Sequence, residues 1–166
     1  SKDILDSITV YYQGTPKDSN NRSFTKYTHN QIPILWTMSE PYGSKDWWPC
    51  KQSLNDKIDS IDIIVTTPAI YRVAANGILV KEIQSGNNKT YYWKHRYPIA
   101  AYLIGIAVTN YTAYSDYVPM GENDSLEVLN YVYADSVNLA DAQKHTKELI
   151  PMMQLYNNLF GDYPFK

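Results

Sequence analysis

The sequence predicts a mainly β protein, an antiparallel sheet-rich saddle or sandwich followed by a C-terminal α-helical segment. Apolar and polar residues alternate along most of the chain up to about residue 134, and this is the period of a strand with one buried face. From about residue 135 the apolar residues recur at intervals of three, four and seven, which is the period of a helix. With 166 residues, the chain is long enough to bury a substantial core.

The first expected strands lie in the N-terminal part of the chain. Alternation predicts a strand at 8–12, a short apolar run predicts another at 32–37, and the polar stretch 16–31 between them predicts a solvated loop. The clearest alternation runs over 57–67 and ends at Pro68. Each of these strands should bury one face in the core.

A pair of strands joined by a tight turn is expected next. Asn76-Gly77 lies between the alternating stretches 71–75 and 78–83. Asn-Gly is the strongest short signal for a type I′ hairpin, because both central residues of that turn need positive φ. Gly86-Asn87-Asn88 predicts another turn. The remaining expected strands are 90–97, 102–109 and 126–133.

A helical segment closes the chain. Ser136 is expected to cap its N-terminus, and Gly161 is expected to end it. Because proline in a helix interior costs about 3 kcal/mol or forces a kink, we expect a break at Pro151, with this residue in the first turn of a second segment. The change of period divides the chain into a β region, 1–134, and a helical region, 135–166.

Charge and apolar content exclude several classes of partner. The formal net charge of −2 provides no basic surface for nucleic acid. No stretch reaches the roughly 20 apolar residues of a membrane span, and the single cysteine excludes an internal disulfide. The compartment stays open, although 16 tyrosines and Asn- and Ser-rich loops favour an exported protein, periplasmic or extracellular. If strands at the front of the sheet are missing, an exposed sheet edge would favour self-association.

The sequence contains no complete catalytic or metal-binding pattern. His29, His95 and His145 lie far apart, and none belongs to an H-E-x-x-H sequence, which binds zinc through two histidines four residues apart. Cys50 has no histidine close in sequence to act as its base. We therefore assign no catalytic residue and no metal ligand, and we do not expect this chain to be catalytic alone.

The stretch from Trp36 to Cys50 is unusually dense in tryptophan and proline, and Glu40 follows the strand predicted at 32–37. Two interpretations fit this stretch. It is either a turn whose aromatic side chains pack on the sheet, or a loop whose carboxylate at the strand end binds a cation such as an amine.

The same stretch resembles a motif of the alanyl-aminopeptidase-like gluzincin zinc metallopeptidases, in which T-Q-x-E-P is followed by an aromatic residue, Pro and Cys. Thr37-Met38-Ser39-Glu40-Pro41 and Trp48-Pro49-Cys50 occur here in the same order and spacing. Three further stretches are similar to segments of that family: 65–77, 98–105 and 160–165. The resemblance implies that 1–134 is the C-terminal part of a β-rich N-terminal domain and that 135–166 is the helical start of a truncated catalytic domain.

The resemblance also implies a function for the parent protein, the zinc-dependent removal of N-terminal residues from peptides. In that family the Glu of the motif binds the free α-amino group of the peptide substrate, and the Gln helps to form the pocket for its first side chain. These positions are Glu40 and Met38 here. The zinc motif would lie beyond residue 166, so this chain would hold no cofactor and would help to shape a site completed by the missing catalytic domain. Met38 departs from the family, because a thioether cannot make the hydrogen bonds of Gln.

Two alternatives stay open. The chain could be a non-catalytic β-domain that binds carbohydrate or protein through exposed aromatic side chains such as Tyr42, Trp47 and Trp48. It could also be part of an inactive peptidase homologue, which Met38 favours. A zinc motif in the full-length sequence would separate the active from the inactive peptidase, and binding to a sugar array would support the first alternative.

Overall fold

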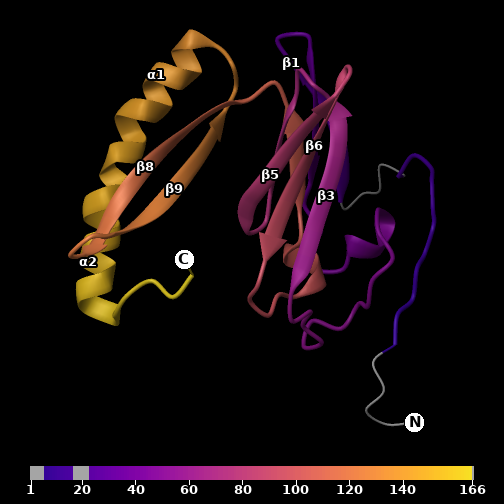
Figure 1. Cartoon of the computed structure of the whole chain (residues 1–166), viewed down its shortest axis with the longest axis horizontal. Helices are drawn as coiled ribbons and strands as arrows, with labels where there is room; N and C mark the ends of the chain where they lie inside the picture. Colours follow the sequence, from indigo (N-terminus) through magenta and orange to yellow (C-terminus); the bar gives the residue numbers. More distant parts are fainter. Residues whose placement is uncertain (1–5, 17–22, 166) are drawn as a thin grey trace.

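The computed structural model describes residues 6–16 and 23–165, and Figure 1 shows the path of the chain. Within these residues the strands are β1 (Phe24–His29), β2 (Ile32–Thr37), β3 (Ile61–Pro68), β4 (Arg72–Ala75), β5 (Ile78–Ser85), β6 (Asn88–His95), β7 (Ile106–Thr109), β8 (Thr112–Gly121) and β9 (Asp124–Val132). The helices are the 3₁₀ turns η1 (Ser44–Asp46), η2 (Ala101–Leu103) and η3 (Thr146–Glu148), and the α-helices α1 (Ser136–His145) and α2 (Leu149–Phe160).

The described strands form three sheets with the orders β1-β2-β7-β4, β3-β6-β5 and β8-β9. Every pairing in these sheets is antiparallel. The helical segment follows the last strand. The structure therefore confirms a mainly β, antiparallel fold with a C-terminal helical segment. The outer strands β3 and β5 carry sheet edges, and pairing with a second copy through such an edge stays a prediction.

The core lies where the first two sheets meet. Val73 of β4 is buried against Tyr91 and Trp93 of β6, so one strand of each sheet contributes to the same cluster. Partly buried apolar side chains surround it: Ile63, Val65, Ala75, Leu79, Val108 and Tyr131. The Tyr91 hydroxyl is also satisfied, because it donates a hydrogen bond of 2.8 Å to the carbonyl of Tyr71. The expectation that the strand predicted at 57–67 buries one face is confirmed, because Ile63 and Val65 of β3 pack against this cluster.

The predicted Asn-Gly hairpin is wrong. β4 pairs with β7 while β5 pairs with β6, so Asn76-Gly77 carries the chain from one sheet to the other. Gly77 has a φ of 91°, but Asn76 does not have positive φ. The Asn76 side chain instead donates to the carbonyl of Leu103 at 3.0 Å and accepts from the N–H of Gly105 at 2.7 Å. These hydrogen bonds to a distant segment hold Asn76-Gly77 where the chain passes between the sheets. The local sequence around Asn76 does not indicate them. The turn predicted at Gly86 is confirmed, because it joins β5 to β6.

The N-terminal part of the chain differs from the predictions in two ways. Residues 8–12 form no strand and are exposed, because alternation yields a strand only when another strand bonds to it. Part of the loop expected at 16–31 is the strand β1, paired with β2, while 17–22 lie outside the described residues. Asn30 and Gln31 join β1 to β2 with φ values of 49° and 66°. The turn with two positive φ values therefore occurs here rather than at Asn76-Gly77.

Two strand predictions in the second half also need correction. The sequence did not predict β8, which pairs with β9 along nearly its whole length. The strand expected at 102–109 begins only at Ile106, because residues 101–103 form the turn η2. The Gly105 N–H is used by Asn76 and not by a neighbouring strand, which explains the late start.

The helical segment follows the prediction except at its first residue. The N-cap is Asp135 and not Ser136, since the Asp135 carboxylate accepts a hydrogen bond of 2.8 Å from the backbone N–H of Asn138. The break near Pro151 is confirmed, because η3 separates α1 from α2 and leaves the proline in the first turn of α2. Gly161, with a φ of 89°, ends α2 as predicted.

The helices lie along the β8–β9 hairpin, beside the other two sheets (Figure 1). Aromatic side chains join this terminal unit to the sheets. The ring of Tyr131 lies 6.3 Å from that of Trp93, and the ring of Phe165 lies 4.8 Å from that of Tyr97. The Tyr97 hydroxyl also donates to the carbonyl of Pro164 at 3.3 Å. None of the helices in the described part of the chain has the length and apolarity needed to cross a membrane.

Replacing Asn76 with alanine should lower the free energy of unfolding by about 1–3 kcal/mol, because backbone groups of Leu103 and Gly105 lose their partner. Urea unfolding followed by tryptophan fluorescence measures the change. Asn55→Ala, in an exposed loop, is the control and should leave the midpoint unchanged. Equal effects of the two substitutions would contradict the role of Asn76.

Acid should weaken the start of α1. Hydrogen bonds from the backbone of Asn138, then from its side chain, and then from His29 hold the pKa of Asp135 below its ordinary value of 3.8. A carboxyl group with a lowered folded pKa stabilises the fold above its ordinary pKa, and this stabilisation is lost as pH falls through the lowered value. We expect helical circular dichroism to fall below pH 3.8, and less so in Asp135→Asn, which keeps a capping oxygen without the charge. Identical acid profiles would refute this expectation.

Candidate functional site

The candidate site is the loop between β2 and η1. Met38 and Glu40 both lie on it and both are exposed, Met38 with 53% of its surface. No hydrogen bond or ion pair joins the Glu40 carboxylate to another described residue, and the Glu40–Pro41 peptide bond is cis. Among the described residues, the carboxylate therefore has no partner that a ligand would have to displace.

Three buried serines hold this loop on the protein: Ser23, Ser39 and Ser44. The Ser23 carbonyl accepts from the backbone N–H of Met38 at 3.2 Å, and its hydroxyl donates to Asp46 at 2.9 Å. The Ser39 hydroxyl accepts from the indole N–H of Trp47 at 2.8 Å. The loop is thus stabilised by a network of polar side chains and backbone groups.

The loop passes so close to Ser23 that only glycine fits at position 43. A Cβ atom added to Gly43 would lie 1.9 Å from the Ser23 hydroxyl oxygen and 2.9 Å from its Cβ atom. The backbone N–H of Gly43 donates to the carbonyl of Ser39 at 2.8 Å, which closes the turn around Glu40. The missing side chain is what allows the two segments to touch.

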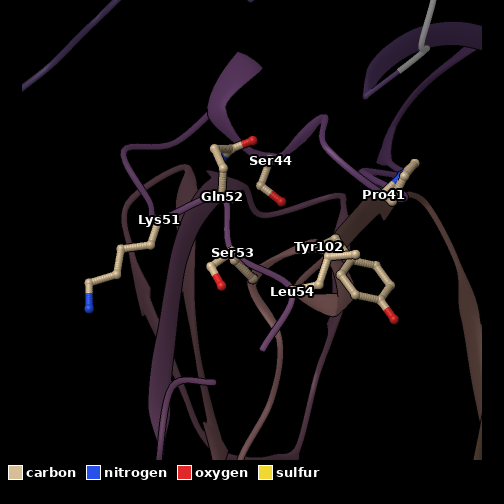
Figure 2. Close-up of a pocket in the computed structure, with 8 residues that line it drawn as sticks. Pro41, Ser44, Lys51, Gln52, Ser53, Leu54 and Tyr102 are labelled. Carbon is tan, nitrogen blue, oxygen red and sulfur yellow. The ribbon is translucent and has the colours of Figure 1, made fainter. Parts of the chain in front are cut away.

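A small cavity lies behind the loop (Figure 2). Its lining residues are Pro41, Ser44, Lys51, Gln52, Ser53, Leu54, Ala101 and Tyr102. It has room for about one water molecule, whereas pockets for small ligands measure roughly 300–1,000 Å³. The cavity is therefore no substrate pocket, but it shows that η2 packs directly behind the Glu40-Pro41 turn.

The structure brings together segments that resemble the peptidase family and lie far apart in sequence. The Thr37 hydroxyl accepts from the backbone N–H of Ile106 at 3.0 Å, and Asn76 holds the adjacent Gly105. Asn76 therefore links the stretch 65–77 to 98–105, and Thr37 bonds to Ile106, the residue that follows the second stretch.

Cys50 and the histidines form no second site. Burial raises the pKa of the Cys50 thiol, although hydrogen bonds from Ser44 and Gln52 oppose this, so the thiol is a poor nucleophile at neutral pH. His29 contacts Asp135 at 3.3 Å and His145 contacts Asp141, at separate places in the fold. No group of three or more His, Cys, Asp or Glu side chains that could hold a metal ion occurs in 6–16 and 23–165.

A wider hollow of about 620 Å³ lies on the other side of the loop. Residues 12–16 form one wall, and Phe24, Lys45, Trp47 and Trp48 contribute to the other. The indole N–H of Trp47 is bound to Ser39, and that of Trp48 is buried without a partner in the described part of the chain. Neither N–H is offered to a ligand in this hollow.

Sequence reasoning named Met38 and Glu40 as candidates, and it did not indicate the residues that hold their loop. Ser23 and Ser39 are small polar residues in loop sequence, and nothing in their spacing indicates that they are buried. The contact between Ser39 and Trp47 spans eight positions without helical or strand periodicity. The abundance of tryptophan in the stretch was the sole sequence signal for this network.

Comparison with known proteins identifies the fold. No protein-family model and no curated protein sequence matches the chain. A crystal structure of an M1 zinc metallopeptidase from Deinococcus radiodurans matches with a TM-score of 0.67 and 22% identity, over 80% of this chain and 30% of that one. This chain shares the fold of an M1 metallopeptidase region. The expected resemblance is thus confirmed at the level of the fold.

Two further structures agree with this match. A mutant of a two-domain M1 zinc metallopeptidase bound to L-arginine has a TM-score of 0.65 and 21% identity, and a mutant from Deinococcus radiodurans bound to a Tyr-Ser-Ala substrate has a TM-score of 0.65 and 22% identity. Each match covers 80% of this chain and 30% of the other. The chain therefore spans about a third of the length of these metallopeptidases.

Replacing Gly43 with alanine should lower the free energy of unfolding by about 1–3 kcal/mol, because the new methyl group overlaps the Ser23 hydroxyl. Thermal unfolding of this variant and of the Ser23→Gly/Gly43→Ala double variant measures the effect. Removal of the Ser23 side chain should restore part of the loss that Gly43→Ala causes. A double variant whose losses simply add would show that the two residues do not clash.

Proposed function

We propose that this chain is part of a zinc-dependent aminopeptidase that removes N-terminal residues from peptides. In this proposal 1–134 belongs to the N-terminal domain and 135–166 begins the catalytic domain. Glu40 anchors the free α-amino group of the substrate, and Met38 lines the pocket for the first side chain. The observation that carries the proposal is an exposed carboxylate that has no partner among the described residues, on a loop held by buried hydrogen bonds, in a fold shared with M1 zinc metallopeptidases.

The chemistry of Glu40 suits an ammonium group. A carboxylate and an ammonium form a short, charge-assisted hydrogen bond that is about twice as strong as a neutral one. A loop backbone that is already held in place loses little conformational freedom when the substrate binds, so more of this interaction appears as affinity. A peptide with a blocked N-terminus has no charge to offer, which would restrict the enzyme to free N-termini.

Met38 would make the side-chain pocket more apolar than one containing Gln. Its exposed thioether is flexible and polarisable, and it can pack against aliphatic and aromatic side chains of different shapes. It cannot donate a hydrogen bond to a polar side chain. We therefore propose a substrate pocket that favours apolar first residues.

Zinc would supply the water that attacks the peptide bond in the parent enzyme. The described residues do not fit a zinc site, because their His, Cys, Asp and Glu side chains form no cluster of ligands. The metal would be held by other parts of the parent enzyme. The work of this chain is then to bind and orient the substrate amine.

A β-domain that binds carbohydrate or protein is the second candidate. Tyr42 is exposed and Trp47 and Trp48 border a wide hollow, which agrees with such a surface. However, neither indole N–H can bind a sugar hydroxyl or a peptide carbonyl in the present arrangement. The peptidase proposal makes use of the free Glu40 carboxylate, and this alternative does not.

Glu40→Gln in the full-length protein tests the proposal. Loss of the charge should reduce kcat/KM for an aminoacyl-amide substrate by about 10- to 100-fold, because a hydrogen bond between charged groups becomes a weaker neutral one. Zinc content should stay unchanged, since Glu40 is not a metal ligand. Glu122→Gln, an exposed residue between β8 and β9, is the matched control. A parent protein without zinc, or with unchanged turnover in Glu40→Gln, would refute the proposal.

A further inference from the structure

We infer that Trp47 and Ser39 act as a positioning pair that holds the Glu40 backbone in place and so sets where its carboxylate can reach. The inference rests on the proposed function of Glu40 and adds two residues that never touch the substrate. Its physical basis is one buried hydrogen bond between the indole N–H of Trp47 and the Ser39 hydroxyl, 2.8 Å long.

Ser39 is the residue that fixes the turn before Glu40. It is buried, with 2% of its surface exposed. Its carbonyl accepts from the backbone N–H of Gly43 at 2.8 Å, and its hydroxyl accepts from Trp47. Because both the backbone and the side chain of Ser39 are held, the peptide unit that leads into Glu40 has little freedom to rotate.

Trp47 is itself anchored from another direction. It follows η1, where its backbone N–H donates to the carbonyl of Ser44 at 3.2 Å. The preceding Asp46 carboxylate accepts from the Ser23 hydroxyl at 2.9 Å. Because the backbone around Trp47 is held in this way, the indole group holds Ser39 at a fixed place relative to η1.

Trp48 provides a natural comparison. It follows Trp47 directly, its ring lies 6.0 Å from the Trp47 ring, and it is also half-buried. Its indole N–H has no hydrogen-bond partner among the described residues. Replacing Trp48 with phenylalanine thus removes a similar ring from the same loop without removing a bond to Ser39.

Loss of the Trp47–Ser39 hydrogen bond should weaken recognition of the substrate's free α-amino group. The loop would still be held by Ser23 and Gly43, so the fold would be retained. The Glu40 carboxylate would move away from the position in which it bonds to the substrate amine. A misplacement of about 1 Å can cost on the order of 100-fold in rate. The effect should fall on ligands that carry a free α-amino group and should spare ligands that lack it.

The test compares Trp47→Phe, Ser39→Ala, the double variant and the control Trp48→Phe in the full-length zinc-loaded enzyme. It measures KM and kcat for an aminoacyl-amide substrate, and the inhibition constants of an amino acid amide and of its N-acetyl analogue. Trp47→Phe should raise KM and the inhibition constant of the free amine about tenfold, and leave the N-acetyl analogue and zinc content unchanged. Trp48→Phe should change each value less than about twofold. The double variant should be no worse than the worse single variant, because both substitutions break the same bond.

The outcomes separate this inference from the proposed function. If Glu40→Gln has no effect, the proposed function fails and this inference fails with it. If Glu40→Gln lowers kcat/KM but Trp47→Phe behaves like Trp48→Phe, the positioning inference alone is overturned. An equal rise for the free amine and the N-acetyl analogue would also overturn it, because it would indicate general loosening. If Trp47→Phe fails to fold, Ser39→Ala breaks the same bond with a smaller change and decides the question.

Discussion

The contact of Val73 with Tyr91 and Trp93 is the packing interaction on which the other parts of the structure depend. It packs β4 of one sheet against β6 of the other. Each of these strands is hydrogen-bonded to neighbours in its own sheet, β4 to β7 and β6 to β3 and β5. β4 bonds to β7 and β7 bonds to β2, so the position of β2 follows from this one cluster. The site loop begins where β2 ends. Two strand pairings, β4 with β7 and β7 with β2, therefore connect the core to the candidate site through backbone hydrogen bonds.

The loop itself is held by different physics. Burial of apolar surface is non-directional, but hydrogen bonds are directional, and the loop around Glu40 relies on the latter. Ser23, Ser39 and Gly43 bring three pieces of chain into contact at distances that larger side chains would prevent. Such an arrangement holds the backbone of Glu40 at a defined place on the surface. It is also sensitive to small changes that an apolar core would absorb.

The terminal unit is joined to the sheets mainly by aromatic side chains. Tyr131 packs against Trp93 of the core, and Tyr97 contacts Phe165 near the end of the chain. His29 stacks on Tyr133 with ring centres 4.1 Å apart, next to its contact with Asp135. These contacts connect both ends of the helical segment to the β region. Pro164 and Phe165 thus contribute to the contact between the two parts.

The sequence by itself determined three of the strands and where the helix breaks. β3 and β6 were predictable because alternation is a local property of the chain, and β2 was predictable from its short apolar run. Pro151 was predictable because its ring excludes a regular helix interior. Glu40 was chosen as a candidate from its motif, and its role stays a prediction. Only the tertiary structure decided which strands pair, that Asn76-Gly77 crosses between sheets, and that Ser39 is bound by Trp47. Those features depend on contacts between groups that are distant in the chain and come together only in the folded protein. A local sequence pattern does not identify such partners.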